Sequence, residues 1–248
     1  MLYDQEVVDS LTQNVLDGNV RATSILPLIE TSTPLLPFPV LFKLVLATKI
    51  NIGDVTKIKS LKYITPKALD KIIKPLEEDV YVSIGENYLE FIDPSGVKEQ
   101  FYYKTGILAT LDEKPSLDKV TNMFYTVDYI RNRIDRISGA ADPYHMACTM
   151  PLQKMYFILY IGDEDLVKVI HSSIKLLAET GIGSKHSVGL GKFKIVEAKN
   201  IEEFNPILSR YLPSTLNDES YYWVSMGKYA PKDSGEPVSY THLTLPTN

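Results

Sequence analysis

The stretch between residues 154 and 198 restricts the possible folds more than any other part of the chain. It opens with the apolar run KMYFILYIG, which predicts a buried strand. The following DEDLVKVIHSSIKLLAET predicts a helix with Asp163 as N-cap and Gly181 as left-handed C-cap, and its apolar stripe consists of Leu166, Val169, Ile170, Ile174 and Leu177. A glycine-rich loop comes next, and KFKIVEA then predicts another strand. The order strand, helix, loop, strand matches the second half of a βαββαβ ferredoxin-like unit.

The first half of such a unit needs two strands and a helix. Residues 7–16 carry apolar side chains at helical spacing up to Gly18, so they predict the helix. A strand near Arg133 would supply the second strand, and the first strand would be missing from the sequence as given. The predicted class is therefore α+β with a ferredoxin-like (RRM-like) lobe, in which residues 20–105 form an insertion.

The insertion has its own pattern. Four prolines, at positions 27, 34, 37 and 39, predict extended loop with short strands in place of a long helix over residues 24–50. TPKALDKIIKPL predicts a short helix capped by Thr65. The runs VYVSI, YLEFI and EQFYYK, separated by turn residues, predict antiparallel strands between residues 80 and 103. The lysine-rich run KIKSLKYITPK is typical of a solvated face.

Charge and cysteine content limit the function. The chain of 248 residues has a formal net charge of −5, so nucleic-acid binding would need a local basic patch or partner subunits. The single cysteine, Cys148, excludes an internal disulfide and a CxxC metal site, fits a reducing cytoplasm, and is typical of a small buried hydrophobe. The most apolar stretch, residues 35–47, is short and interrupted by prolines and Lys43, which excludes a membrane span there.

The loop TGIGSKHSVGLGKFKI is the strongest candidate for a binding site. Each of Gly181, Gly183, Gly189 and Gly191 could be explained by a helix end or a strand entry alone. Together, however, the glycines would let backbone N–H groups form an anion-binding concavity, to which nearby side chains add hydroxyls and charge: Ser184, Lys185, Ser187 and Lys192. The loop lies between a helix and a strand, which excludes a Walker P-loop and a dinucleotide fingerprint. A sugar–phosphate backbone fits it better.

A second candidate is the segment RNRIDRISGAADPYH. Arg131, Arg133 and Arg136 lie close together, and arginines bind phosphates and stack on unpaired bases. The alternative is a surface strand whose arginines pair with Asp135 and Asp142. Strand alternation would place Arg133 on one face and Ile134 and Arg136 on the other.

These segments resemble a known family. LLAETGIGSKHSVGLGKFKI resembles the glycine-rich loop of the RAMP proteins, and more narrowly that of the fourth Csm subunit of type III-A CRISPR effector complexes. Further similarity lies in ATSILPLIETSTPLLPFPV, YIRNRIDRISGAADPYHMACTM and RYLPSTLNDESYYWVSMGKYAP, so that the resemblance covers most of residues 1–234. The sequence departs from the family pattern at Ser184, His186 and Val188.

The resemblance implies a RAMP fold and a function. Such a subunit caps the 5′ tag of the crRNA, docks against the large polymerase-like subunit beside the backbone RAMP subunits, and is not catalytic. The RNA-binding residues implied are the loop and hairpin positions Gly181, Gly183, Ser184, Lys185, His186, Ser187, Gly189, Gly191, Lys192, Arg131, Asn132, Arg133 and Arg136. No cofactor and no metal are expected.

The predicted domain boundaries follow from the same comparison. Residues 1–200 would form the N-terminal lobe and residues 201–236 the start of a truncated second ferredoxin-like lobe. Residues 237–248 contain VSYTHLTLPTN, which resembles translated sequencing adapter and is predicted to be an artefact.

Two alternatives from other classes stay open at this point. A RAMP-type crRNA-processing endoribonuclease would use a histidine as general acid or base, and His145 or His186 could serve, whereas His171 lies mid-helix and fits a structural role. A ferredoxin-like protein-interaction module without RNA would fit the acidic balance. Metal chemistry has little support, because Asp112–Glu113 and Glu202–Glu203 are adjacent pairs whose side chains diverge.

Overall fold

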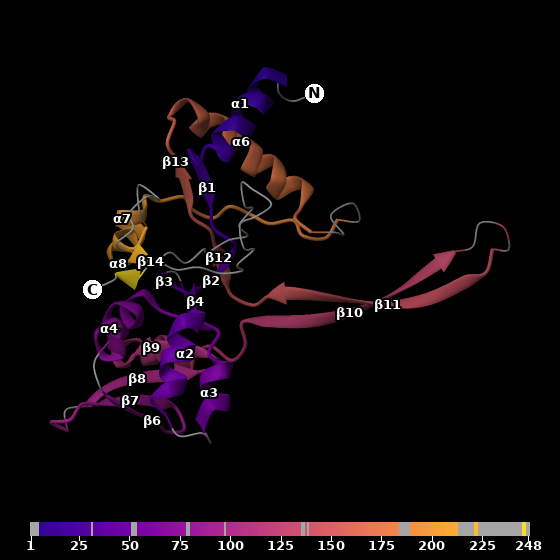
Figure 1. The fold of residues 1–248 in the computed structure, drawn as a ribbon. Helices are drawn as coiled ribbons and strands as arrows, with labels where there is room; N and C mark the ends of the chain where they lie inside the picture. Colours follow the sequence, from indigo (N-terminus) through magenta and orange to yellow (C-terminus); the bar gives the residue numbers. More distant parts are fainter. Residues whose placement is uncertain are drawn as a thin grey trace, which may run out of the picture. The chain divides into compact units, whose positions relative to one another are not determined.

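The structure, a computed structural model, consists of two compact units (Figure 1). Unit 1 comprises Met1–Ser24 and Phe157–Pro206, and unit 2 comprises Ile25–Tyr156 and Ile207–Asn248. The residues described are 5–30, 32–50, 54–77, 80–96, 98–134, 137, 139–183, 189–212, 221–222 and 245–246.

Unit 2 is built around a six-stranded sheet with the order β4-β5-β9-β8-β7-β6. Only β5 and β9 pair in parallel, and every other neighbouring pair is antiparallel. The strands are β4 (Leu36–Pro37), β5 (Tyr63–Ile64), β6 (Tyr81–Ile84), β7 (Tyr88–Ile92), β8 (Lys98–Lys104) and β9 (Ile107–Thr110). The antiparallel strands predicted between residues 80 and 103 are confirmed as β6, β7 and β8.

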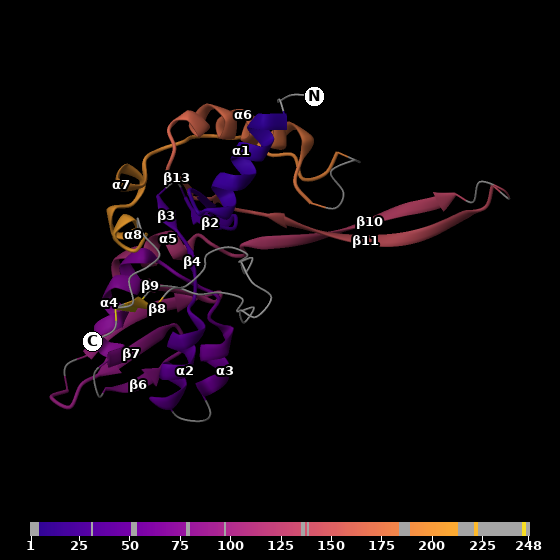
Figure 2. The ribbon, with the colours of Figure 1, turned by 45° about the horizontal axis from the view of Figure 1, so that its top comes forward.

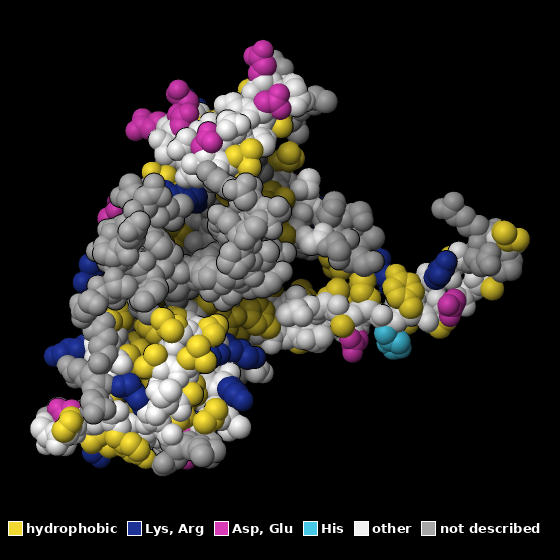
Figure 3. Space-filling model, viewed as in Figure 1, with side chains coloured by type: hydrophobic (Ala, Val, Ile, Leu, Met, Phe, Trp, Pro, Cys, Tyr) yellow, Lys and Arg dark blue, Asp and Glu magenta, His cyan; other side chains and the backbone are white. Residues whose placement is uncertain are grey.

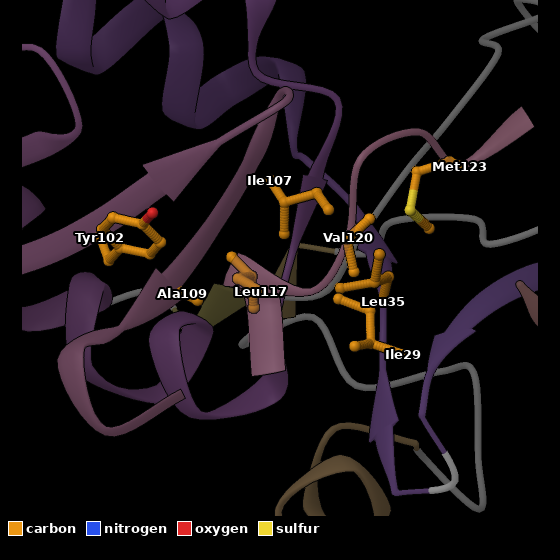
Figure 4. Packing of buried hydrophobic residues seen from close by; sticks show 8 residues of the cluster. All are labelled: Ile29, Leu35, Tyr102, Ile107, Ala109, Leu117, Val120 and Met123. Carbon is orange, nitrogen blue, oxygen red and sulfur yellow. The ribbon is translucent and has the colours of Figure 1, made fainter. Parts of the chain in front are cut away.

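Short helices accompany this sheet and share its core. They are α2 (Val40–Thr48), α3 (Val55–Ser60), α4 (Pro66–Glu77), the 3-10 helix η2 (Leu111–Glu113) and α5 (Lys114–Asp118). One core cluster joins strands to the segment around α5 (Figure 4), and its members are Ile29, Leu35, Tyr102, Ile107, Ala109, Leu117, Val120 and Met123. Thr65 begins α4 as predicted, since its Oγ1 accepts a hydrogen bond from the Ala68 N–H (3.3 Å).

Unit 2 also contains a small three-stranded sheet and a long hairpin. The small sheet has the order β12-β2-β3, with β2 (Leu26–Ile29), β3 (Thr33–Pro34) and β12 (Lys154–Tyr156). The hairpin pairs β10 (Phe124–Ile134) with β11 (Ala141–Pro151) over eleven residues each, and Figures 1 and 2 show it as a narrow two-stranded ribbon. β14 (Tyr221–Tyr222) pairs with β15 (Leu245–Pro246), and α8 spans Pro206–Arg210.

Unit 1 is formed by two segments of the chain that are far apart in the sequence. β1 (Val20–Ala22) follows α1 (Gln5–Leu16) and pairs antiparallel with β13 (Leu159–Ile161). α6 (Asp165–Thr180) comes after β13, and α7 spans Ile201–Phe204. Residues 192–200 are described and contain no helix or strand.

The α+β class is confirmed, and so are the helices predicted at residues 7–16 and from Thr65. The ferredoxin-like arrangement and the domain boundaries stay predictions. Among the described strands, β13 pairs with β1, directly after α1, and the strand containing Arg133 pairs with β11. The strand β1 was not predicted, because it is three residues long and carries too weak an alternating pattern to be recognised.

Three further predictions are wrong. The proline-rich segment includes a nine-residue helix, α2, because its last proline, Pro39, sits at the N-cap with φ −61° and leaves the following residues free. The strand predicted for KFKIVEA does not form, since residues 192–198 have no paired neighbour among the described residues. The run KMYFILYIG is divided into β12 and β13, which belong to different sheets.

Candidate nucleic-acid interface

The glycine-rich loop closes on itself by backbone hydrogen bonds. α6 ends where the N–H of Gly181 donates to the Leu177 carbonyl (2.8 Å), with Gly181 at φ +92°. The next residue, Ile182, donates its N–H to the carbonyl of Gly191 (2.9 Å), and Phe193 donates to Ala178 (3.2 Å). We call the contact of residues 181–182 with residues 190–193 the neck of the loop.

Glycine is required on both sides of the neck. A Cβ on Gly191 would lie 1.9 Å from the Ile182 oxygen, and one on Gly181 would lie 2.6 Å from the Leu190 oxygen. Neither distance is compatible with a side chain. Gly183 and Gly189 differ: their φ angles are +105° and +84°, but a Cβ there would meet nothing within 4 Å. These two positions need glycine for conformation only.

The tip of the loop lies outside the described residues, and with it Ser184, Lys185, His186, Ser187 and Val188. Lys192 lies within the neck, is exposed and forms no ion pair with another described residue, whereas Lys199 pairs with Glu197 (2.8 Å). The neck thus holds the two ends of a glycine-rich loop together and carries one lysine without an acidic partner among the described residues.

Lys194 was missed by the sequence analysis. It is exposed, as is Lys192, while the intervening Phe193 and the following Ile195 are half-buried. This alternation of exposure was visible in KFKI as an alternation of lysine with apolar residues, but it was interpreted only as a strand signal.

The hairpin register decides which of its candidate residues share a face. Directly opposed residues of an antiparallel pair point to the same side, and successive residues point to opposite sides. Arg131 is opposite Tyr144 and Arg133 opposite Asp142, so both arginines lie on one face. We call it the arginine face. Asn132, opposite Pro143, lies on the other face, and Arg136 lies outside the described residues.

The arginine face also carries aromatic side chains that the sequence analysis missed. Tyr129 is two residues before Arg131, and Tyr144 is directly across from it. Period-two alternation indicates Tyr129 from the sequence, but Tyr144 can be assigned only once the register is known. Tyrosine rings beside guanidinium groups are a usual platform for unpaired bases.

The arginines are available for a ligand. The competing prediction paired them with Asp135 and Asp142. Although Asp142 lies across from Arg133, neither Arg131 nor Arg133 forms an ion pair with another described residue, and Asp135 is outside the described part. Cys148 is only half-buried, opposite Val127 in the two-stranded hairpin, so its expected full burial is wrong.

The described histidines, His145 and His171, lie on different elements. His145 is exposed, lies opposite Ile130 on the face away from Arg131 and Arg133, and forms no hydrogen bond with another described residue. His171 is exposed in the middle of α6. Over the described ranges, no group of three or more His, Cys, Asp or Glu side chains could hold a metal ion.

The acidic pair Asp112–Glu113 is used in packing. The Lys67 Nζ lies 2.7 Å from Asp112 Oδ2, and this hydrogen bond is the main cause that lowers the pKa of Asp112 to about 2. Glu113 is buried and accepts hydrogen bonds from Thr65 Oγ1 (2.6 Å) and Thr110 Oγ1 (2.9 Å).

In the part of the chain that the structure describes, none of the helices has the length and apolar character to span a bilayer.

Comparison with known proteins gives a consistent result. No protein-family model matches the chain. A segment of 93 residues, 36% of the chain, is 40% identical to the CRISPR system Cms protein Csm4 of Methanocaldococcus jannaschii, and the match spans 24% of that relative's length.

The fold is similar to a crystal structure of the Csm3-Csm4 subcomplex in the type III-A CRISPR-Cas interference complex. The TM-score is 0.51, the match covers 96% of this chain and 78% of that chain, and the sequence identity is 17%. At that identity the likeness shows the fold. Together with the similar 93-residue segment, it confirms the resemblance predicted from the sequence, a resemblance to Csm4.

Proposed function

We propose that this Csm4-like chain is a non-catalytic crRNA-binding subunit of a type III CRISPR effector complex. In this role it caps the 5′ tag of the crRNA and docks the large polymerase-like subunit beside the backbone RAMP subunits. The observation that carries the proposal is the neck, where Gly181 and Gly191 let two backbone segments meet and hold a serine- and lysine-bearing loop at a helix end. The similarity to Csm4 supports it independently.

The loop binds phosphate through its backbone and its lysines. Glycine-rich backbone in left-handed conformations presents N–H groups to an anion at close range, and lysine adds a point charge. Gly183 and Gly189, at positive φ with free space around them, frame the segment that carries Lys185. Lys192 adds charge at the neck. The loop therefore contributes affinity for a sugar–phosphate backbone without reading its sequence.

The hairpin contributes stacking. Arg131 and Arg133 lie on the same face as Tyr129 and Tyr144, so unpaired bases can stack there while the guanidinium groups reach phosphates. Asn132 cannot share this contact, because it projects from the opposite face. We therefore assign the RNA contact of the hairpin to the arginine face.

The chain acts without cleaving RNA. Acid–base catalysis on a ribose 2′-hydroxyl needs a histidine oriented by a partner within hydrogen-bond reach. His145 has none among the described residues and lies on the opposite face from Arg131 and Arg133.

The first test is to tag the chain in its host, purify it gently and sequence the RNA that stays bound. We expect guide RNAs that share one 5′ sequence, together with a large subunit and repeated backbone subunits. Protein without RNA and without such partners would overturn the proposal and favour the interaction module. Incubation with repeat-containing RNA should leave the RNA intact. Cleavage that His145→Ala or His186→Ala abolishes would favour the endoribonuclease instead.

The loop is tested by Lys185→Ala combined with Lys192→Ala. Each lost phosphate contact should weaken RNA binding and reduce the slope of log K against log salt by about 1. The matched control is Lys175→Ala, an exposed lysine on α6 that belongs to neither candidate surface. Equal salt slopes for the double variant and the control would remove the loop from the binding site.

A further inference from the structure

The helix α2 exposes an apolar stripe beside the part of unit 2 that the structure describes. Seven of its nine residues, VLFKLVLAT, are apolar, so the helix is apolar on nearly every side. Phe42 and Leu46 are buried at 2% and 0% exposure, while Val40, Leu41 and Leu44 remain 55%, 44% and 61% exposed. A helix that is apolar all round is normally buried on all sides.

The three exposed side chains form one continuous surface. Residues three or four positions apart are neighbours on a helix, so Leu44 lies beside both Val40 and Leu41, and the three make a single stripe. The stripe is entirely aliphatic. In Figure 3 hydrophobic side chains gather where α2 lies in Figure 1, with Lys and Arg at their edges.

Lysines without acidic partners border this stripe. Lys43 Nζ lies 3.4 Å from the carbonyl of Lys59, the next-to-last residue of α3, which brings the end of α3 beside α2. The carbonyl of Lys62 accepts a hydrogen bond from the Phe38 N–H (2.8 Å), two residues before α2 begins. None of these three lysines forms an ion pair with another described residue, in contrast to Lys57, which pairs with Asp54 (3.2 Å).

The electrostatics show the same imbalance. Burial lowers the pKa of Lys43, and the charge of Lys62 lowers it further. The two ammonium groups therefore repel each other at a site where a carboxylate would relieve both. This local excess of positive charge occurs in a chain of net charge −5.

We propose that the stripe of Val40, Leu41 and Leu44 with its border of Lys43, Lys59 and Lys62, here called the α2 surface, docks a segment of a partner protein. The segment has an apolar ridge about two helical turns long, flanked on one side by Asp or Glu. Apolar contact supplies the binding energy, and the carboxylates set the orientation. The proposal does not depend on RNA binding by the loop or the hairpin.

A protein fits this surface better than RNA or a membrane. RNA would meet aliphatic side chains where it needs aromatic or guanidinium faces for its bases. An interfacial membrane helix carries a strongly charged face opposite its apolar one, whereas α2 is apolar on nearly every side and has Lys43 as its single charged residue.

The test places a photo-crosslinking amino acid at position 44 of the full chain in its host and identifies the linked peptide. We expect a peptide of another protein in the purified complex, with acidic residues beside apolar ones. A cross-link to RNA, to lipid or to a second copy of this chain would overturn the proposal, as would the absence of any cross-link when a probe on the arginine face gives one.

Two variants then examine the chemistry. Leu41→Ser with Leu44→Ser should reduce co-purification of the linked protein by about tenfold, and Leu152→Ser, another exposed leucine of unit 2, should leave it unchanged. Lys59→Glu with Lys62→Glu should weaken binding, and exchange of the partner's linked carboxylates for lysine should restore it. Failure of that restoration contradicts the charge pairing, and Lys71→Glu on α4 is the control for added negative charge. All variants must unfold at the temperature of the parent chain, since every substituted side chain is exposed.

Discussion

The two units differ sharply in how completely they bury their apolar side chains. In unit 2 the largest fully buried side chains lie on strands and on helices, among them Phe91, Phe101 and Leu36 on strands of the six-stranded sheet and Leu46 on α2. Among the described residues of unit 1, the buried apolar side chains are Leu166, Ile170 and Ala178, all on α6. The helix α1 contributes none.

Unit 1 also exposes many large apolar side chains for its size. They include Val8, Val15, Leu16, Phe157, Tyr160, Val167, Leu176, Leu177, Ile182 and Val196. Stability rises with the apolar area removed from water. Unit 2 therefore has a core that can stabilise it, whereas unit 1 depends more on its backbone hydrogen bonds. The two proposed binding sites lie in different units: the glycine-rich loop belongs to unit 1, and the α2 surface belongs to unit 2.

The largest effect is expected from the core of unit 2. Phe101 is fully buried and packs edge-on against Phe91, with ring centroids 5.5 Å apart. Phe101→Ala should lower the free energy of unfolding by about 3–5 kcal/mol. Leu176→Ala, at a residue 42% exposed in unit 1, should cost less than about 1 kcal/mol. Urea denaturation of both variants measures the contrast, and equal losses would break the comparison of the two units.

The next effect concerns the neck, where unit 1 is held by backbone contact. Gly191→Ala puts a Cβ 1.9 Å from the Ile182 oxygen, so the neck must open at a cost of about 2–3 kcal/mol. The amide of Ile182, which donates to Gly191, should then exchange its hydrogen about 30- to 150-fold faster. Gly189→Ala has the same kind of φ but free space, so its effect should be smaller. If both variants exchange alike, close approach is not what fixes the neck.

The sequence predicted the elements with strong local signals and missed those defined by contacts distant in the chain. The helical pattern of α6, its C-cap Gly181 and the turn residues between β6, β7 and β8 are local, and they were predicted correctly, whereas the N-cap of α6 is Glu164 and not the predicted Asp163. The three-residue strand β1 became recognisable only through its pairing with β13. For α2 the error was of another kind: prolines forbid helix at and before themselves, but they permit one immediately afterwards.

The candidate site shows the same division. The glycines of the loop are evident from the sequence, but their division into two steric and two conformational positions depends on how close Ile182 comes to Gly191. The arginines of the hairpin were likewise evident, while the separation of Asn132 from them and the contribution of Tyr144 follow from the register. Composition thus identifies the chemistry, and pairing between distant residues decides which groups can act together.

A smaller effect is expected at the buried cap of unit 2. Thr65 is fully buried, donates from Oγ1 to Glu113 (2.6 Å) and accepts from the Ala68 N–H (3.3 Å). Thr65→Val keeps the shape but removes both bonds, so it should cost about 1–2 kcal/mol of unfolding free energy. Thr65→Ser keeps the hydroxyl and should retain most of the stability. If Thr65→Ser lowers the free energy of unfolding as much as Thr65→Val, the effect comes from packing of the Thr65 methyl group. The close-packed core of unit 2 would then include the start of α4.

The smallest effect lies on the surface of unit 2, where Asp112 and Lys67 are 58% and 48% exposed. Asp112→Asn should cost less than about 1 kcal/mol, because water screens an exposed ion pair. The hydrogen bond from Lys67 lowers the pKa of Asp112 to about 2 in the folded chain, below the value of about 4 expected when unfolded. The contribution is therefore present above about pH 4 and lost as the pH falls toward 2. Thermal unfolding of both proteins across this range should show their difference disappearing at low pH. If the difference persists at pH 2, it arises from uncharged contacts, and the stability of unit 2 rests on its packed interior alone.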